Sequence, residues 1–217
     1  MTKPVIVLGG GGHAKVVVDA LRLSGIDIVG IADKNSKVGE SIFSDLPVLG
    51  GDESVLNYSR EEVELVNGLG SFPGYNLRTE LFHFFSEKGY RYQTVVHPAA
   101  IVSDGVLLQQ GVQVMAGAVI QPGAVVGLNS IINSRASVDH DCVIGNSCHV
   151  APGAILSGNV TLGDSVHIGT GAVVIQSIDI ENKVVVGAGA VVTSNIPKNS
   201  IVYPARSIIK EGESNEP

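Results

Sequence analysis

Every sixth residue of this chain is aliphatic from Val102 to Val192, without a break in register. Sixteen consecutive matches exclude an α-helix, whose apolar stripe recurs every 3.6 residues, and a simple alternating strand, whose period is two. Mostly small residues stand two positions before members of this series: Ala118, Ala124, Ser130, Ala136, Cys142, Cys148, Ala154, Ala172 and Ala190. Glycines directly follow several members, where we expect the chain to turn: Gly127, Gly145, Gly163, Gly169 and Gly187.

This pattern predicts a parallel β-helix of hexapeptide repeats. Three hexads make one triangular coil of eighteen residues, and each inward aliphatic residue stacks on its counterpart in the next coil. No coil buries its apolar residues alone, so the stack itself forms the core. We expect this all-β domain over residues 97–210, followed by a polar, acidic and disordered tail over residues 211–217.

Charge and composition exclude several classes of partner. The net charge of −7 is spread over both halves of the chain, which argues against nucleic acid or an anionic membrane as a partner. The apolar run Val5–Leu8 is too short for a signal peptide or a membrane span, so we expect a cytoplasmic protein. Cys142 and Cys148 occupy small-residue positions of the repeat, where packing explains them better than a disulfide.

Residues 1–96 predict an α/β, Rossmann-like nucleotide-binding domain. An apolar strand over 4–8 runs into four glycines, a helix that ends near Ser24, and a second strand over 28–32. This order is typical of a mononucleotide-binding unit, in which glycines let the backbone approach phosphate at a helix N-terminus. A third strand is expected over 63–66. A helix is expected over 76–88 with four residues facing inward: Leu77, Leu81, Phe84 and Phe85.

The glycine turn also satisfies the dinucleotide fingerprint, as Gly9-x-Gly11-x-x-Ala14 with Asp33 about 20 residues on. A nicotinamide-dependent dehydrogenase is therefore an alternative. However, only about 95 residues precede the repeats, which is room for one half of a dinucleotide fold. This favours a domain that binds a nucleotide-linked substrate. The remaining alternative is that the glycine turn serves tight packing only and binds no ligand.

His140 is the first candidate for chemistry in the repeats. It stands two residues after the inward Val138, on a turn, so its ring should face outward between Asp139 and Asp141. A carboxylate beside a histidine fixes its tautomer and raises its basicity, which suits a general base. The alternative is an exposed turn histidine with acidic neighbours.

Two further histidines, His149 and His167, are eighteen residues apart and should stack on adjacent coils. Such a column suggests zinc, but a zinc site needs a third ligand, and His140 lies half a coil away. A zinc site shared between subunits is a conceivable but disfavoured alternative, and we expect no metal.

The chain resembles the bacterial PglD-like UDP-4-amino-sugar N-acetyltransferases over about residues 4 to 210, with sialic acid O-acetyltransferases as near relatives. The resemblance is carried by the opening Gly-Gly-Gly-Gly-His-Ala-Lys-Val-Val, by Asn133-Ser134-x-Ala136-x-Val138-Asp139-His140-Asp141-Cys142-x-Ile144-Gly145, by His149-Val150-x-Pro152-Gly153-Ala154 with Gly158-Asn159-Val160, and by Pro204-Ala205-Arg206. The hexads alone specify only a large superfamily. The glycine-rich opening joined to the histidine–carboxylate pair narrows it.

The resemblance implies a left-handed β-helix and transfer of an acetyl group from acetyl-CoA to the 4-amino group of a UDP-linked amino-deoxy sugar, for a bacterial surface glycan or glycoprotein. It further implies direct transfer in a ternary complex and a homotrimer with active sites between subunits. O-acetylation of a sugar such as sialic acid is the first alternative. A non-catalytic or zinc-dependent β-helix protein that binds nucleotide through its N-terminal domain is the second.

Site residues are carried over from the same resemblance. His140 matches the general base, and Asp141 matches the acidic residue that increases its basicity. The positions matching acetyl-CoA contacts are His149, Thr170 and Ala188. The positions matching the nucleotide-sugar site are Gly11, Gly12, His13, Asp33, Lys34 and Gly70.

Overall fold

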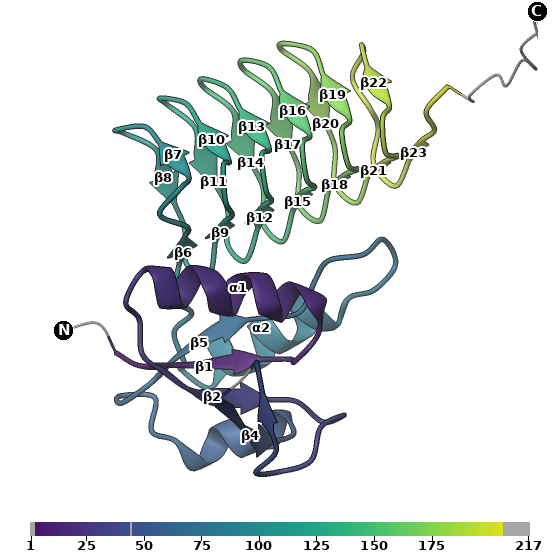
Figure 1. Cartoon of the computed structure of the whole chain (residues 1–217). Coiled ribbons are helices and arrows are strands. Elements are labelled where there is room, and N and C mark those ends of the chain that lie inside the picture. Colours follow the sequence, from purple (N-terminus) through teal and green to yellow (C-terminus); the bar gives the residue numbers. More distant parts are fainter. Residues whose placement is uncertain (1–2, 44, 206–217) are drawn as a thin grey trace, which may run out of the picture.

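The computed structural model describes residues 3–43 and 45–205, and it contains a small α/β lobe joined to a long column of coils (Figure 1). The predicted tail over 211–217 and Arg206 of the terminal motif lie outside the described residues. The two-part fold is confirmed: an N-terminal α/β region is followed by a left-handed parallel β-helix. Within the described residues, no helix has the length and apolar character needed to cross a bilayer.

A five-stranded sheet with strand order β3-β4-β2-β1-β5 forms the centre of the N-terminal lobe. Its elements are β1 (Val5–Leu8), α1 (Gly12–Leu23), β2 (Ile28–Ala32), β3 (Ser41–Ile42), β4 (Leu46–Gly50), the 3₁₀ helix η1 (Asp52–Asn57), β5 (Glu64–Asn67) and α2 (Leu77–Glu87). The interior strand β1 runs parallel to its neighbours β2 and β5, and all four of its residues are buried. Helix α1 buries Ala14, Val17 and Leu21 on one side because these residues recur at helical spacing.

Two features of this lobe differ from the sequence expectation. Strands β3 and β4 were not predicted, since Pro47 interrupts the short apolar run of β4 and proline is disfavoured inside a sheet. The inward face of α2 was also predicted wrongly at Phe84, which is 44 % exposed, whereas Phe82 is buried. Phe82 packs on the Tyr92 ring at a centroid distance of 4.6 Å, while Phe84 lies under the Lys88 ammonium.

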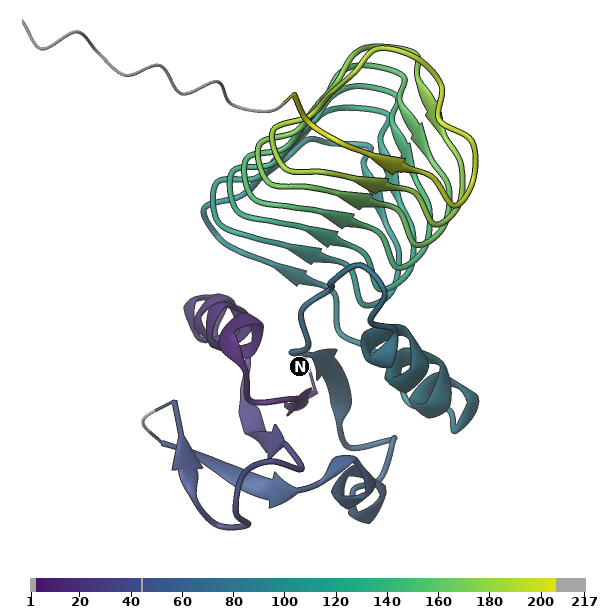
Figure 2. The same ribbon diagram turned by 90° about the vertical axis from the view of Figure 1, so that its right-hand side faces the viewer.

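From Val95 to Val192 the column consists of two-residue strands that repeat every six residues and pair with strands eighteen residues away. The last strand, Ile201–Val202, pairs with residues sixteen positions earlier. They are β6 (Val95–Val96), β7 (Ile101–Val102), β8 (Leu107–Leu108), β9 (Gln113–Val114), β10 (Val119–Ile120), β11 (Val125–Val126), β12 (Ile131–Ile132), β13 (Ser137–Val138), β14 (Val143–Ile144), β15 (His149–Val150), β16 (Ile155–Leu156), β17 (Thr161–Leu162), β18 (His167–Ile168), β19 (Val173–Val174), β20 (Asp179–Ile180), β21 (Val185–Val186), β22 (Val191–Val192) and β23 (Ile201–Val202). Figure 2 looks along the column and shows its triangular outline.

Three flat faces result from this pairing. The lobe face contains β6, β9, β12, β15, β18, β21 and β23, and the N-terminal lobe lies against its first coils (Figure 1). The apolar face contains β7, β10, β13, β16, β19 and β22. The mixed face contains β8, β11, β14, β17 and β20.

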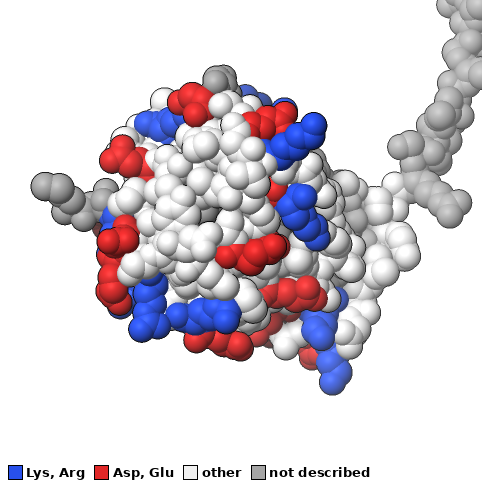
Figure 3. Space-filling view, turned by 90° about the horizontal axis from the view of Figure 1, so that it is seen from below, with Lys and Arg blue, Asp and Glu red and all other residues white. Residues whose placement is uncertain are grey.

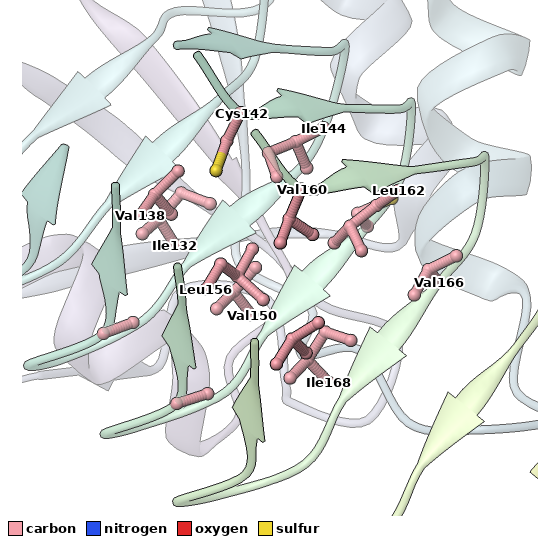
Figure 4. Packing of buried hydrophobic residues seen from close by; sticks show 14 of the residues in the cluster. Ile132, Val138, Cys142, Ile144, Val150, Leu156, Val160, Leu162, Val166 and Ile168 are labelled. Atoms are coloured by element: carbon pink, nitrogen blue, oxygen red, sulfur yellow. The ribbon is translucent and has the colours of Figure 1, made fainter. Parts of the chain in front are cut away.

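The second residue of most of these strands points into the column, where the inward residues form the core seen in Figure 4. Fourteen of the sixteen hexad positions are fully buried, and only Val102 and Leu108 in the first coil are half-buried. Burial of each Val, Leu or Ile side chain stabilises the fold by roughly 1.5–3 kcal/mol. Cys142 and Cys148 are buried free thiols among these residues, as predicted.

The glycines that follow the inward residues have a different role from the one expected. The turns are made by residues with positive φ three positions after each inward residue, such as Asn129, Arg135 and Asp141. Gly127 and Gly145 are not in this conformation, but a Cβ on either would lie 2.6 Å from the backbone of the next coil. Glycine is therefore required there by the close approach of successive coils.

Candidate functional site

His140 and Asp141 lie on the turn between β13 and β14, at the corner where the apolar face meets the mixed face. The side chain of His140 is 60 % exposed, as the sequence predicted, and its Nδ1 is 2.8 Å from Oδ2 of Asp141. The hydrogen bond to Asp141 raises the pKa of His140, and the charge of Asp139 adds to the effect. Because Nδ1–H donates to the carboxylate, Nε2 is the nitrogen left to accept a proton.

The next coil supports the His140 ring from below. A Cβ on Gly158 would lie 2.6 Å from both Cε1 and Nε2 of His140, so only glycine leaves room for the ring in this position. Asp141 has a φ of 59°, in the left-handed region that the column's other turns also adopt at this position. The backbone therefore fixes how the carboxylate and the imidazole face each other.

A cavity of about 230 Å³ lies at the carboxyl edge of the lobe sheet, where open α/β sheets bind ligands. Among the residues predicted for a nucleotide, Gly11, Asp33 and Lys34 line it. Asp33 braces the glycine loop, because its two carboxylate oxygens accept hydrogen bonds from the backbone N–H groups of Gly10 and Asn35, both at 2.8 Å. Asp52 and Tyr75 also line this cavity and were missed, since each follows a segment without a motif.

Gly12, His13 and Gly70 are close to this cavity in sequence but do not line it. Gly12 is the first residue of α1, and Gly70 lies in the loop between β5 and α2. Among the described residues, apart from the chain neighbours and the backbone of α1 itself, no atom lies within 4 Å of a Cβ built on Gly11 or Gly12, so tertiary packing does not require glycine at either position.

His13 points instead toward the column. Its Nε2 donates to Oε1 of Gln113 on β9 at 2.8 Å, and the Gln113 amide donates in turn to the Asn67 carbonyl at 2.7 Å. Burial, with the nearby Arg78 charge, lowers the pKa of His13 to about 4, so the ring is neutral at pH 7. The ring fixes the lobe against the lobe face.

Arg78 makes a second set of polar contacts between the lobe and the column, and the sequence did not predict it. Its guanidinium is buried and donates to the carbonyls of Asn67 and Leu69 at 2.9 and 2.6 Å in the lobe. It also donates to the carbonyl of Asn129 in the column at 3.2–3.3 Å. Burial lowers the pKa of Arg78 to about 9, so its charge persists at neutral pH.

His149 is buried on the lobe face, and both of its ring nitrogens have partners. Nδ1 donates to the Ser71 carbonyl at 3.1 Å, and Nε2 accepts from the Asn133 amide at 3.0 Å. Burial, followed by the neighbouring His167, lowers the pKa of His149 to about 3. The predicted stacking of His149 and His167 is confirmed, with paired strands and ring centroids 5.0 Å apart.

Thr170 and Ala188 are exposed residues one coil apart, on the turns between the lobe face and the apolar face. They therefore follow a different corner of the column from His140. A second cavity, of about 240 Å³, lies between the loop 71–76 and the column, and Tyr75 lines both cavities. Within the residues that the structure describes, no group of three or more His, Cys, Asp or Glu side chains could hold a metal ion.

The surface of the lobe seen in Figure 3 carries interspersed acidic and basic side chains rather than a continuous patch of one sign. The two thiols are also unsuited to nucleophilic chemistry. Burial raises the pKa of Cys142 and raises that of Cys148 to about 12, which disfavours the reactive thiolate.

Comparison with known proteins identifies the family. Residues 4–83 match the family model described as the PglD N-terminal domain. PerB from Caulobacter crescentus, solved with CoA and GDP-perosamine, is 34 % identical with a TM-score of 0.84, covering 93 % of this chain and 94 % of PerB. The acetyltransferase domain of PglB from Neisseria gonorrhoeae is 32 % identical with a TM-score of 0.84, covering 92 % and 96 %. WeeI from Acinetobacter baumannii, at 23 % identity and a TM-score of 0.81 over 93 % and 97 %, shares the fold.

A PglD-type N-terminal α/β lobe on a hexapeptide β-helix defines an acyltransferase of the left-handed β-helix class. Within that class, the chain belongs to the PglD-like sugar N-acetyltransferases, enzymes that use acetyl-CoA. The expected family and co-substrate are thus confirmed.

Proposed function

We propose that this enzyme transfers the acetyl group of acetyl-CoA to the 4-amino group of a nucleotide-linked amino-deoxy sugar, with His140 as the general base. The observation that carries the proposal is the outward His140–Asp141 pair, whose free Nε2 faces solvent from a corner of the column. We propose that the reaction takes place in the cytoplasm.

The proposed reaction requires one side chain that accepts a proton and later returns it. The neutral amine attacks the thioester carbonyl, a C–N bond forms, and Nε2 of His140 accepts the proton that the nitrogen loses. The C–S bond then breaks, and the imidazolium returns the proton to the departing thiolate, giving the amide and free CoA. Asp141 stabilises the transient imidazolium through the 2.8 Å hydrogen bond to Nδ1. The high thiol pKa values of the cysteines favour this direct transfer over an acyl-cysteine intermediate.

For the nucleotide we propose the cavity at the carboxyl edge of the lobe sheet. Gly11 and Gly12 at the start of α1 offer backbone N–H groups to the diphosphate, and Asp33 and Lys34 lie where the ribose follows. Gly70 belongs to the adjacent loop, and His13 orients the lobe rather than contacting the ligand. The resemblance implies a uridine nucleotide, whereas PerB was solved with a GDP-linked sugar.

For acetyl-CoA we propose a path along the corner marked by Thr170 and Ala188, which the spacing of one coil places in line. His149 lies on the lobe face next to that corner, and we propose that its neutral ring, held by Ser71 and Asn133, contacts the coenzyme by packing. This corner is separated from His140 of the same chain by the whole apolar face.

Within one chain, His140 lies apart from the nucleotide lobe and from the proposed coenzyme corner. This separation supports a homotrimer with active sites shared between subunits. The lobe lies against the lobe face (Figure 1), while His140, between β13 and β14, lies on the corner between the other two faces. The apolar face is bare of the chain's own lobe and presents outward aliphatic residues on every strand except β13, where the outward residue is Ser137: Ile101, Val119, Ile155, Val173 and Val191. Such a surface fits a second copy of the chain. In that arrangement His140 of one subunit meets the nucleotide lobe of its neighbour.

The reaction is tested by following thiol release from acetyl-CoA with UDP-, GDP- and dTDP-linked 4-amino sugars. We expect thiol release with at least one of them, and none with the matched 4-hydroxy sugars, because a hydroxyl is a much weaker nucleophile than a neutral amine. Mass spectrometry of the product should show one added acetyl group on nitrogen. Activity restricted to hydroxyl groups, as on sialic acid, would refute N-acetylation by this enzyme.

The shared site predicts complementation between two inactive chains. Chains carrying His140→Ala lack the base, and chains carrying Asp33→Ala lose the brace of the glycine loop. After unfolding and refolding together in equal amounts, the mixture should regain about a quarter of the wild-type rate, because about one interface in four combines an intact base with an intact lobe. Each variant refolded alone is the control. A mixture that stays inactive would place the site within one chain.

A further inference from the structure

The unpredicted strand β4 brings a second carboxylate, that of Asp52, into the nucleotide cavity. Asp52 follows the carboxyl end of β4, as Asp33 follows β2 and the glycine loop follows β1. Since β4, β2 and β1 are neighbours in one sheet, these three strand ends form a row along the edge of the cavity. The row ends at Asp52.

This order matches the order of groups in a nucleoside diphosphate. In folds of this kind the phosphates bind at the first strand's loop, and the carboxylate after the second strand binds the ribose. The next strand end is then left for the base. Two strand spacings separate β1 from β4, or about 9–10 Å, which a ribose with its base can span.

Asp52 is also free to take a ligand. Its side chain lines the cavity, yet within residues 3–43 and 45–205 its carboxylate accepts no hydrogen bond, whereas both oxygens of Asp33 are occupied. Burial raises the pKa of Asp52, and the adjacent Lys34 ammonium opposes that shift. A half-buried acceptor without a partner is expected to gain from a donor on the ligand.

The chemistry of a carboxylate distinguishes between bases. An ionised carboxylate only accepts hydrogen bonds, and its two oxygens can take two parallel N–H groups. Guanine presents such a pair, N1–H and the N2 amino group, side by side. Uracil presents one N–H between two carbonyl oxygens, which a carboxylate repels.

We infer that Asp52 reads the base of the donor nucleotide and selects a guanosine-diphosphate-linked sugar. This rests on the proposed function of the cavity as the nucleotide site, and it replaces the uridine nucleotide expected from sequence. Asp52 acts here as a specificity residue at the base and takes no part in acetyl transfer.

Calorimetric titration of the full chain with GDP and with UDP tests the inference. Wild-type protein should bind GDP about tenfold or more tightly than UDP. In Asp52→Asn one carboxylate oxygen becomes an NH2 group, which opposes one of the two guanine N–H donors in the proposed pairing. The remaining donor and acceptor match a carbonyl oxygen and the N–H of uracil. GDP affinity should therefore fall about tenfold to hundredfold while UDP affinity holds or rises. Glu53→Gln is the matched control, because it removes a neighbouring exposed charge outside the cavity and should leave the ratio unchanged.

The outcomes separate this inference from the function on which it rests. Preference for UDP by the wild type, an equal loss of both nucleotides in Asp52→Asn, or the same change in Glu53→Gln would overturn the role of Asp52 and leave the nucleotide site intact. Failure of the wild type to bind either nucleotide would overturn the nucleotide site itself. A thermal melt of Asp52→Asn that matches the wild type excludes misfolding as the cause.

Discussion

Replacement of His140 by alanine is expected to lower the turnover number by about 10²–10⁴-fold, the usual contribution of a positioned general base. The KM for acetyl-CoA should change little, because a general base stabilises the transition state and is not among the residues proposed to bind the coenzyme. His83→Ala is the matched control, because His83 is an exposed histidine on α2 that lines neither of the two cavities described above. A rate for His140→Ala within a few-fold of the wild type would remove His140 from its proposed role.

The pH dependence of activity is a second test of His140 as the general base. The base must be unprotonated, so activity should rise with pH through the pKa of His140. Asp141 and Asp139 raise that pKa, and Asp141→Asn removes the largest contribution. The rising limb of the kcat/KM profile should therefore move to lower pH in Asp141→Asn, while the maximum rate falls because the base is weaker. A limb that moves to higher pH, or stays in place, would contradict the contact seen between Asp141 Oδ2 and His140 Nδ1.

The sequence predicted the column and its base because both depend on local spacing. A period of six with no exception leaves one architecture that buries every aliphatic residue, and the outward position of His140 follows from its offset to Val138. His140 and Asp141 are adjacent in the chain, so their contact needs no knowledge of the tertiary fold. Handedness came from the resemblance alone, since a repeat of six does not encode it.

Contacts between the lobe and the column could not be predicted in this way. His13 meets Gln113 across 100 positions of sequence, and His149 meets Ser71 across 78. These pairs depend on how the surface of the lobe packs against the surface of the column, and the spacing of residues along the sequence does not predict that packing. The same holds for Asp52, whose place in the cavity depends on β4, a strand hidden by its proline. The need for glycine at position 158 could not be predicted either, because it depends on the His140 ring of the adjacent coil, which leaves no room for a Cβ on Gly158.

Arg78→Met is expected to produce a large loss of stability in the lobe. Arg78 stands on an amphipathic helix at a position that sequence suggests is solvated, yet it is buried and joins three carbonyl oxygens from two parts of the molecule. Methionine fills similar space but donates nothing, so the carbonyls of Asn67, Leu69 and Asn129 lose a charged donor. An unsatisfied buried polar group costs about 1–3 kcal/mol, and removing the buried charge recovers only part of that sum.

We therefore expect the free energy of unfolding of the lobe to fall by about 3 kcal/mol, measured by urea denaturation followed by circular dichroism. Arg78→Lys should rescue little, because one ammonium cannot span the lobe and column carbonyls as the guanidinium fork does. Arg91→Met, at an exposed arginine on the same lobe, is the control and should change stability by less than about 0.5 kcal/mol. If Arg78→Met were as stable as the wild type, relief of the buried charge would outweigh the lost hydrogen bonds. The loop that carries Leu69 and Tyr75 would then be held by packing alone, and the nucleotide cavity would not depend on this contact with the column.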